Sequence, residues 1–263
     1  MLIDILNHPD LPSTNISSLR GGIIGGAGTP GELCQKIYKN LGMQKYVNSF
    51  GSTETTMTAV SNPEDKNIVK PMYVMPHMEM AIINKCGKFV SRGEKGEIVV
   101  RGYSIMQGYW NDEEKTKEVF DKDRWFHTGD IGSMSSDGSI EISGRYKDVI
   151  VRGGFNYYPA EIEQFIVQHP FVADACVIGV PDKLHGEEVC AWIRLKSDTS
   201  LTVDELVEFL ENRISTSKIP RYILFKLQHE FPLTPSGKIK KYELQKLSIK
   251  ELKLEKVTSY CEK

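Results

Sequence analysis

A glycine-rich turn at residues 25–31 lies between a predicted strand and a predicted helix, and no other feature constrains the fold as strongly. The helix covers Glu32 to Asn40, and a second strand follows that leads into Asn48-Ser49-Phe50. A strand, a crossover helix and a second strand form a βαβ unit, in which the two strands are parallel. We therefore predict an α/β fold around residues 19–47.

The turn reads Gly25-Gly26-Ala27-Gly28-Thr29-Pro30-Gly31, and residues 26–31 match the G-x-G-x-x-G spacing of dinucleotide-binding folds. Pro30 removes a backbone N–H from the loop that would have to bind phosphate. A structural turn before a helix is therefore the favoured interpretation, and an oxidoreductase is the weaker alternative. The glycines still allow a flat ligand to approach the backbone, because no Cβ intervenes.

The pattern of predicted elements changes twice along the chain. From 71 to 143 short strands alternate with turns, such as Asp137-Gly138. The later elements are strands at 147–151, 174–180, 188–195 and 222–227, a helix from Pro159 to Pro170, a helix from the capping box Thr202–Glu205 to Ile214, and a helix after Lys238. This order predicts two domains, 1–144 (α/β over 1–70, β-rich over 71–144) and a compact α+β domain over 145–263.

The composition excludes several classes of protein. The five cysteines are an odd number without a C-x-x-C pair, and the six histidines form no H-x-x-x-H pair. This usage argues against a disulfide framework and a zinc site, and it indicates a reducing compartment. The net charge is −2 without a long block of one sign, so neither nucleic acid nor an anionic membrane is indicated as a partner. No apolar run is long enough for a transmembrane segment, and residues 1–15 lack the features of a signal peptide.

Residues 48–54 combine an aromatic ring, hydroxyls and a carboxylate at the end of a predicted strand, where ligand sites of α/β folds occur. The ring of Phe50 could stack on a base, and Thr53 could bind a phosphate oxygen. Glu54 could hold Mg²⁺, which prefers oxygen ligands. Taken alone, the segment is better explained as a polar loop.

Three further segments carry candidate residues. Trp125-Phe126-His127-Thr128-Gly129-Asp130 predicts a loop in which Asp130 could accept hydrogen bonds from ribose hydroxyls, and an ordinary turn is the alternative. Gly144-Arg145-Tyr146-Lys147-Asp148 places charges of both signs at the domain junction, where a surface ion-pair cluster is the ordinary explanation. Thr234-Pro235-Ser236-Gly237-Lys238 predicts a tight turn that presents one lysine to solvent.

In this order and at this spacing the segments resemble the adenylate-forming superfamily of acyl-CoA synthetases, luciferases and peptide-synthetase adenylation domains. The resemblance extends from about residue 16 to about residue 247. Its motifs are the Gly-Gly-Ala turn, the segment 50–54, GEIVVRGYSIMQGYW at 96–110, HTGD at 127–130, GRYKDVIVRGGFNYYPAEIE at 144–163 and PLTPSGKI at 232–239. Within the superfamily the chain looks most similar to the medium-chain fatty acyl-CoA ligases of the acyl-CoA synthetase family member 2 group.

The resemblance implies the C-terminal half of such an enzyme, which activates a fatty acid with ATP and Mg²⁺ and transfers it to coenzyme A. It implies that Lys238 stabilises charge during adenylation and that Glu54 holds Mg²⁺. The implied nucleotide contacts are Gly25, Gly26, Ala27, Asn48, Ser49, Phe50, Gly51, Thr53, Asp130, Arg145 and Lys238. Lys147 would be the hinge of a mobile C-terminal domain, and Gly153-Gly154 would line the channel for coenzyme A. No obligatory protein partner is implied, and the mitochondrial matrix is the expected location.

Two positions and one missing motif depart from the family pattern. Phe50 replaces a tyrosine and keeps the stacking face, whereas Phe155 replaces a glutamate close to the expected path of coenzyme A. The family's phosphate loop is expected upstream of residue 16, and the 263 residues do not contain it. A fragment and a truncated gene product are both compatible with this observation. We expect no useful turnover from these residues alone, and a non-catalytic nucleotide-binding or regulatory module is the alternative function.

Overall fold

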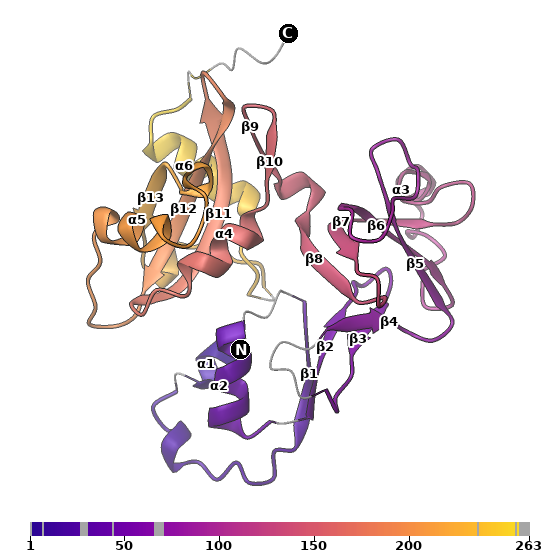
Figure 1. Ribbon diagram of the computed structural model, residues 1–263, viewed down its shortest axis with the longest axis horizontal. Helices are drawn as coiled ribbons and strands as arrows, with labels where there is room; N and C mark the ends of the chain where they lie inside the picture. Colours follow the sequence, from indigo (N-terminus) through magenta and orange to yellow (C-terminus); the bar gives the residue numbers. More distant parts are fainter. Residues whose placement is uncertain are drawn as a thin grey trace. The chain divides into compact units, whose positions relative to one another are not determined.

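The computed structural model describes residues 2–6, 8–26, 31–43, 45–65, 71–235, 237–255 and 257. The chain divides into two compact units, unit 1 (Met1–Ser143) and unit 2 (Gly144–Lys263), and each is described by itself. Figure 1 labels their helices and strands. The predicted domain boundary lies one residue later than this division, and the roles of the units as parts of a large and a mobile domain remain predictions. None of the helices in the described ranges is long and apolar enough to cross a bilayer.

Unit 1 contains one sheet of eight strands in the order β1-β2-β3-β4-β8-β7-β6-β5, so β1 and β5 are its edges. The strands are β1 (Gly21–Gly25), β2 (Lys45–Phe50), β3 (Ala59–Ser61), β4 (Met72–Val74), β5 (Met78–Ile83), β6 (Gly96–Gly102), β7 (Phe126–Met134) and β8 (Ile140–Arg145). The division between the units falls within β8. The α/β segment predicted over 1–70 and the β-rich segment predicted over 71–144 are connected, because β4 pairs with β3 and also with β8. One sheet therefore continues through both segments.

The predicted βαβ unit is confirmed. α2 (Gly31–Leu41) connects β1 to β2, and these two strands are parallel. Cys34, Ile37 and Leu41 on one face of α2 are buried together with Tyr46 of β2. α1 (Leu2–Leu6) lies beside α2 and, with the short helix η1 (Leu11–Ser13), adds leucine side chains to this cluster (Figure 1).

The antiparallel part of the sheet has its own core, formed by Ile82, Ile98, Val100, Phe126 and Ile140. The predicted turn before β8 is confirmed, since Gly138 has a φ of +87° and Asp137 Oδ1 accepts a hydrogen bond of 3.0 Å from the N–H of Ser139. One helix in this part was not expected, α3 (Glu113–Val119). Its N-cap is Asp112, whose side chain accepts a hydrogen bond of 3.0 Å from the N–H of Lys115.

Unit 2 contains a five-stranded sheet in the order β10-β9-β12-β11, with β13 parallel to β12. Its strands are β9 (Ile150–Arg152), β10 (Phe155–Tyr157), β11 (Val172–Asp182), β12 (Gly186–Leu195) and β13 (Tyr222–Phe225). Its helices are η2 (Tyr146–Asp148), α4 (Pro159–Ile166), α5 (Val203–Glu211), η3 (Thr216–Lys218), η4 (Gln228–Glu230) and α6 (Lys241–Glu251).

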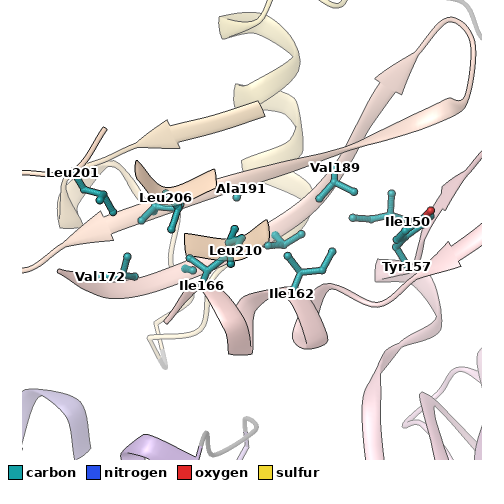
Figure 2. Close-up of a cluster of buried hydrophobic side chains, with 13 residues drawn as sticks. Ile150, Tyr157, Ile162, Ile166, Val172, Val189, Ala191, Leu201, Leu206 and Leu210 are labelled. Carbon is teal, nitrogen blue, oxygen red and sulfur yellow. The ribbon is translucent and has the colours of Figure 1, made fainter. Parts of the chain in front are cut away.

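Both faces of this sheet are buried, because successive side chains of a strand point to opposite faces. Val177, Val189 and Ala191 belong to a cluster with Ile162 of α4 and Leu206 of α5, which Figure 2 shows. The neighbouring residues Cys176, Ile178, Cys190 and Trp192 form a second cluster with Leu244 of α6. The compact α+β fold predicted for this part of the chain is confirmed.

Two helix starts predicted in unit 2 are confirmed. Pro159 is the first residue of α4, and Thr202 forms the predicted capping box with Glu205. The strand predicted at 147–151 is wrong at its start: residues 146–148 form the 3₁₀ turn η2, and β9 begins at Ile150.

Candidate functional site

The carboxyl ends of β1 and β2 bring two groups of predicted residues together. In the parallel register Gly25 is opposite Ser49, whose Oγ donates a hydrogen bond of 3.2 Å to the carbonyl of Ile24. A Cβ on Gly25 would lie 2.4 Å from this hydroxyl oxygen, so any larger residue would force the Ser49 side chain to move. Gly26 has a φ of +85°, and the predicted contact Ala27 lies outside the described residues.

Asn48 and Phe50 contribute to this edge in different ways. Asn48 is 9% exposed, and its side-chain oxygen Oδ1 has no hydrogen-bond partner among the described residues. An unsatisfied buried acceptor is costly, which makes this atom available to a ligand donor. Phe50 is half-buried and packs against the core of the antiparallel part of the sheet, and its carbonyl accepts a bond of 2.9 Å from the N–H of Thr58.

The loop after β2 is held by its own backbone. A Cβ on Gly51 would lie 1.7 Å from the carbonyl oxygen of Thr56, so glycine is required there. The N–H of Ser52 donates a bond of 2.9 Å to Thr55 Oγ1, and Thr56 has a φ of +56°. Thr53 is exposed at the tip of this loop.

Glu54 is tied to the segment that follows β6. The hydroxyl of Tyr109 donates a hydrogen bond of 3.0 Å to Glu54 Oε1, and the N–H of Met106 donates one of 2.7 Å to the Glu54 carbonyl. Burial and this carboxylate acceptor raise the pKa of Tyr109, so its hydroxyl stays a donor. Tyr109 was not predicted as a site residue, and only its place in the 96–110 motif singles it out.

The prediction that Asp130 lies in a loop is wrong. Asp130 lies in a bulge of strand β7. Glu97 of β6 pairs with Ile131 and Val99 pairs with His127, so three residues of β7 oppose one of β6. The extra residues cannot join the regular ladder, which displaces the half-buried Asp130 from it.

The carboxylate of Glu97 supports this bulge. Its Oε1 accepts a bond of 3.2 Å from the N–H of Gly129, and its Oε2 lies 3.1 Å from His127 Nδ1. Thr128 Oγ1 accepts a further bond of 3.0 Å from the N–H of Asp130. Side chains of β6 and β7 thus fix the backbone that carries Asp130.

Arg145 and Lys147 are exposed at the start of unit 2, Arg145 at the end of β8 and Lys147 in η2. Gly153 and Gly154 connect β9 to β10, with φ values of +57° and +83°. Two positive φ values in a two-residue loop are typical of a type I′ hairpin turn. Phe155 follows this turn and is 71% exposed.

Lys238 is exposed on the predicted tight turn. The N–H of Thr234 donates a bond of 2.8 Å to the Lys238 carbonyl, and Thr234 Oγ1 accepts one of 3.0 Å from the Lys238 N–H. Gly237 has a φ of +81°, and Ser236 lies outside the described residues. The turn therefore fixes the lysine backbone and leaves its side chain at the surface.

One cluster has metal-ligand residue types: Asp182, His185 and Glu188 place their ligand atoms within 4.8 Å of one another. Arg152 Nε lies 2.6 Å from one Glu188 oxygen, and Arg221 lies 3.4 Å from Asp182 Oδ2. Two guanidinium groups thus balance the two carboxylates, and a divalent cation would be repelled by both. We interpret Arg152, Asp182, Glu188 and Arg221 as an ion-pair network.

A shallow hollow of about 440 Å³ opens between residues 107–111 and α3. Among the described residues its lining includes Tyr109, which contacts Glu54, and none of the predicted site residues. The candidate residues therefore do not share this hollow.

Two family models match this chain, one within unit 1 and one within unit 2. Residues 1–110 match the family described as AMP-binding enzyme, and residues 161–238 match the AMP-binding enzyme C-terminal domain. The chain is 44% identical over 259 residues to the mitochondrial medium-chain acyl-CoA ligase ACSF2 of Mus musculus, and equally to that of Danio rerio. Each alignment covers 97% of this chain and 42% of the relative, so the chain spans less than half the length of these proteins.

The fold is also similar to solved structures. The ATP-bound MatB of Rhodopseudomonas palustris has a TM-score of 0.84 and 29% identity, over 93% of this chain and 48% of MatB. The adenylate-forming fold inferred from the motifs and the resemblance to medium-chain ligases are thus both confirmed, and the dinucleotide-fold alternative for residues 26–31 has no support. The chain belongs to the AMP-binding enzyme family.

Proposed function

We propose that the protein containing this chain activates a medium-chain fatty acid with ATP and transfers the acyl group to coenzyme A. The observation that carries the proposal is the group Gly25, Gly26, Asn48 and Ser49 at the carboxyl ends of β1 and β2. Ligands of α/β sheets bind at this end of parallel strands. The names of the mouse and zebrafish relatives support a medium-chain acid.

Some of the proposed contact residues would bind the adenine base of ATP, and others would bind its ribose. The Gly25-Gly26 backbone and the Phe50 ring would hold the adenine. Asn48 Oδ1, which has no hydrogen-bond partner in the described part of the chain, would accept a hydrogen bond from the adenine amino group. Asp130, set apart from the ladder by its bulge, would accept hydrogen bonds from the ribose hydroxyls, with Arg145 as a second ribose contact. Ser49 and Gly51 would shape the path towards the phosphates.

Residues 53–54 offer oxygen atoms only, and such a donor set suits Mg²⁺. Glu54 would hold the ion, oriented by the Tyr109 hydroxyl at 3.0 Å, and Thr53 would bind an α-phosphate oxygen. The ion supplies positive charge that offsets the charge of the phosphates.

The reaction has two steps with different requirements. In the first, the fatty carboxylate attacks the α-phosphorus of ATP and pyrophosphate leaves, while Lys238 stabilises the negative charge that develops on the phosphate oxygens. In the second, the thiolate of coenzyme A attacks the acyl carbonyl and AMP leaves. Lys147 would be the hinge between the two steps, and the Gly153-Gly154 turn would line the path of the thiol arm.

A chimera tests this function. The part of the mouse ligase that precedes its match to this chain is fused to residues 1–263, and pyrophosphate release and thioester formation are measured with octanoate. We expect both products from the chimera and little of either from the 263-residue chain alone. A chimera that binds AMP in calorimetry yet forms no acyl-CoA would overturn the proposal and favour a nucleotide-binding module.

The same reasoning extends to the location of the protein. The names of the mouse and zebrafish ligases include the word mitochondrial, and the cysteine usage fits a reducing compartment. We infer the mitochondrial matrix. Recovery of the protein from another fraction, in protease-protected cell fractionation of its source, would contradict this.

A further inference from the structure

Two hairpin turns of unit 2 are bonded to each other. The N–H of Gly153, in the β9–β10 turn, donates a hydrogen bond of 2.8 Å to the carbonyl of His185, in the β11–β12 turn. The N–H of Val151 donates one of 2.6 Å to Glu187 Oε2. Arg152 pairs with Gly186 where β9 meets β12. Three successive residues of one hairpin are thus held by three successive residues of the other.

The ion-pair network lies behind this contact. Glu188 is 1% exposed, and Arg152 Nε lies 2.6 Å from its Oε1. Arg152 also donates from Nη1 to the carbonyl of Ser217 at 3.1 Å. One guanidinium therefore makes an ion pair with Glu188 and a hydrogen bond with Ser217, which the single ammonium group of a lysine cannot reproduce with the same geometry.

Without Arg152, Glu188 Oε1 would lose its ion-pair partner in a site that is 1% exposed. The remaining cationic groups, Arg221 and His185, each lie 3.8 Å from Oε2, so a shift of β9 or β12 would follow to compensate the buried carboxylate. The element nearest to this strain is the Gly153-Gly154 turn, because Gly153 directly follows Arg152. Both glycines are exposed and lack a Cβ, so the backbone itself forms the surface there. A displaced turn would change that surface directly.

We propose that Arg152 is a positioning residue for acyl transfer to coenzyme A. Its buried pair with Glu188 holds the Gly153-Gly154 turn where the thiol arm passes. This inference rests on the proposed function, in which that turn lines the path of coenzyme A. Arg152 is not among the residues assigned to the nucleotide, so the adenylation step should not require it.

The chimera provides the kinetic test. Arg152→Met should raise the KM for coenzyme A by about fivefold or more and leave pyrophosphate exchange within about twofold. Arg152→Lys should recover part of the loss, and Glu188→Gln should resemble Arg152→Met. The matched control is Lys226→Met, which removes the ion pair of 2.8 Å with Glu251 elsewhere in unit 2 and should change neither value.

Hydrogen exchange on the 263-residue chain gives an independent test. In Arg152→Met the Gly153 amide should exchange about tenfold faster or more, with the β11–β12 core unchanged. If Arg152→Met does not fold, Arg152→Lys serves for both measurements. Unchanged exchange at Gly153, an unchanged KM for coenzyme A, or equal losses in both half-reactions would each overturn the inference. Failure of the proposed function differs from these outcomes, because the unsubstituted chimera would then form no acyl-CoA.

Discussion

The candidate residues of the two units differ in how firmly they are held. In unit 1 Asn48 is buried, Glu54 and Asp130 are half-buried, and the backbone around each is fixed by hydrogen bonds. In unit 2 Lys147 and Lys238 are exposed, and the hydrogen bond to Thr234 holds the backbone of Lys238 rather than its side chain.

The two groups of residues are therefore suited to different roles, ligand binding in unit 1 and action in a single reaction step in unit 2. A group held in place before the ligand arrives contributes to binding without reorganisation, which suits the nucleotide contacts. An exposed cation loses no packing when it approaches or leaves a site, which suits a residue needed in one step only. We therefore expect substitutions in unit 1 to weaken binding and substitutions in unit 2 to separate the two half-reactions.

The sharpest separation should come from Lys238→Ala in the chimera. Loss of one charge-stabilising group typically costs about 10²–10³ in rate, and here the loss should fall on adenylation. Thioester formation from supplied acyl-adenylate should remain. Lys240→Ala, two residues after the turn at the N-cap of α6, is the control and should retain both activities. Equal loss of both half-reactions in Lys238→Ala would show that the lysine does not act in one step only.

Asp130→Ala should weaken AMP binding through the loss of charge-assisted hydrogen bonds, which contribute about 1.5–3 kcal/mol each. Calorimetry on the chimera measures the affinity. Asp137→Ala, on the turn after β7, is the matched control. An unchanged AMP affinity in Asp130→Ala would remove Asp130 from the ribose site.

Lys147→Pro tests the hinge, because proline fixes φ near −65° and a rotating junction needs free backbone torsions. One half-reaction should fall on the order of tenfold, about 1.4 kcal/mol, while the other is largely retained. Lys147→Ala keeps the torsions and should behave as the parent. Parallel losses in both half-reactions, with folding intact by circular dichroism, would contradict the hinge.

The smallest effect is expected from Tyr109→Phe, which removes the hydrogen bond to Glu54. We expect a loss of about 0.5–1.5 kcal/mol in the free energy of unfolding of unit 1, measured by urea titration of the 263-residue chain. Tyr103→Phe is the control, since Tyr103 is 70% exposed. If the two variants are equally stable, Glu54 is held by contacts other than Tyr109.

Local sequence patterns predicted the elements that depend on residues close together in the sequence. The glycine-rich turn predicted the βαβ unit, and Thr202 with Glu205 predicted the start of α5, because capping involves residues three apart. The helix α3 could have been found in the same way, since Asp112 is followed by two glutamates that favour a helix N-terminus.

Features that depend on strand register were not predictable. The bulge at Asp130 arises because Glu97, more than thirty residues earlier, bonds to Gly129 and His127. The Tyr109–Glu54 bond and the Arg152–Glu188 pair likewise join residues that no local pattern connects. The sequence motif singled out Asp130 as a candidate residue, but the backbone conformation that presents Asp130 depends on a partner strand.

Strand β1 has a consequence for handling this chain in solution. It is an edge strand, three of its five residues are glycine, and Ile23 is 66% exposed. Glycine-rich strands specify their pairing register weakly, and an open edge presents backbone donors and acceptors to any other extended segment. Its outer edge should therefore be the first place where two copies associate at high concentration. A charged residue at position 23 would act as a gatekeeper against such association.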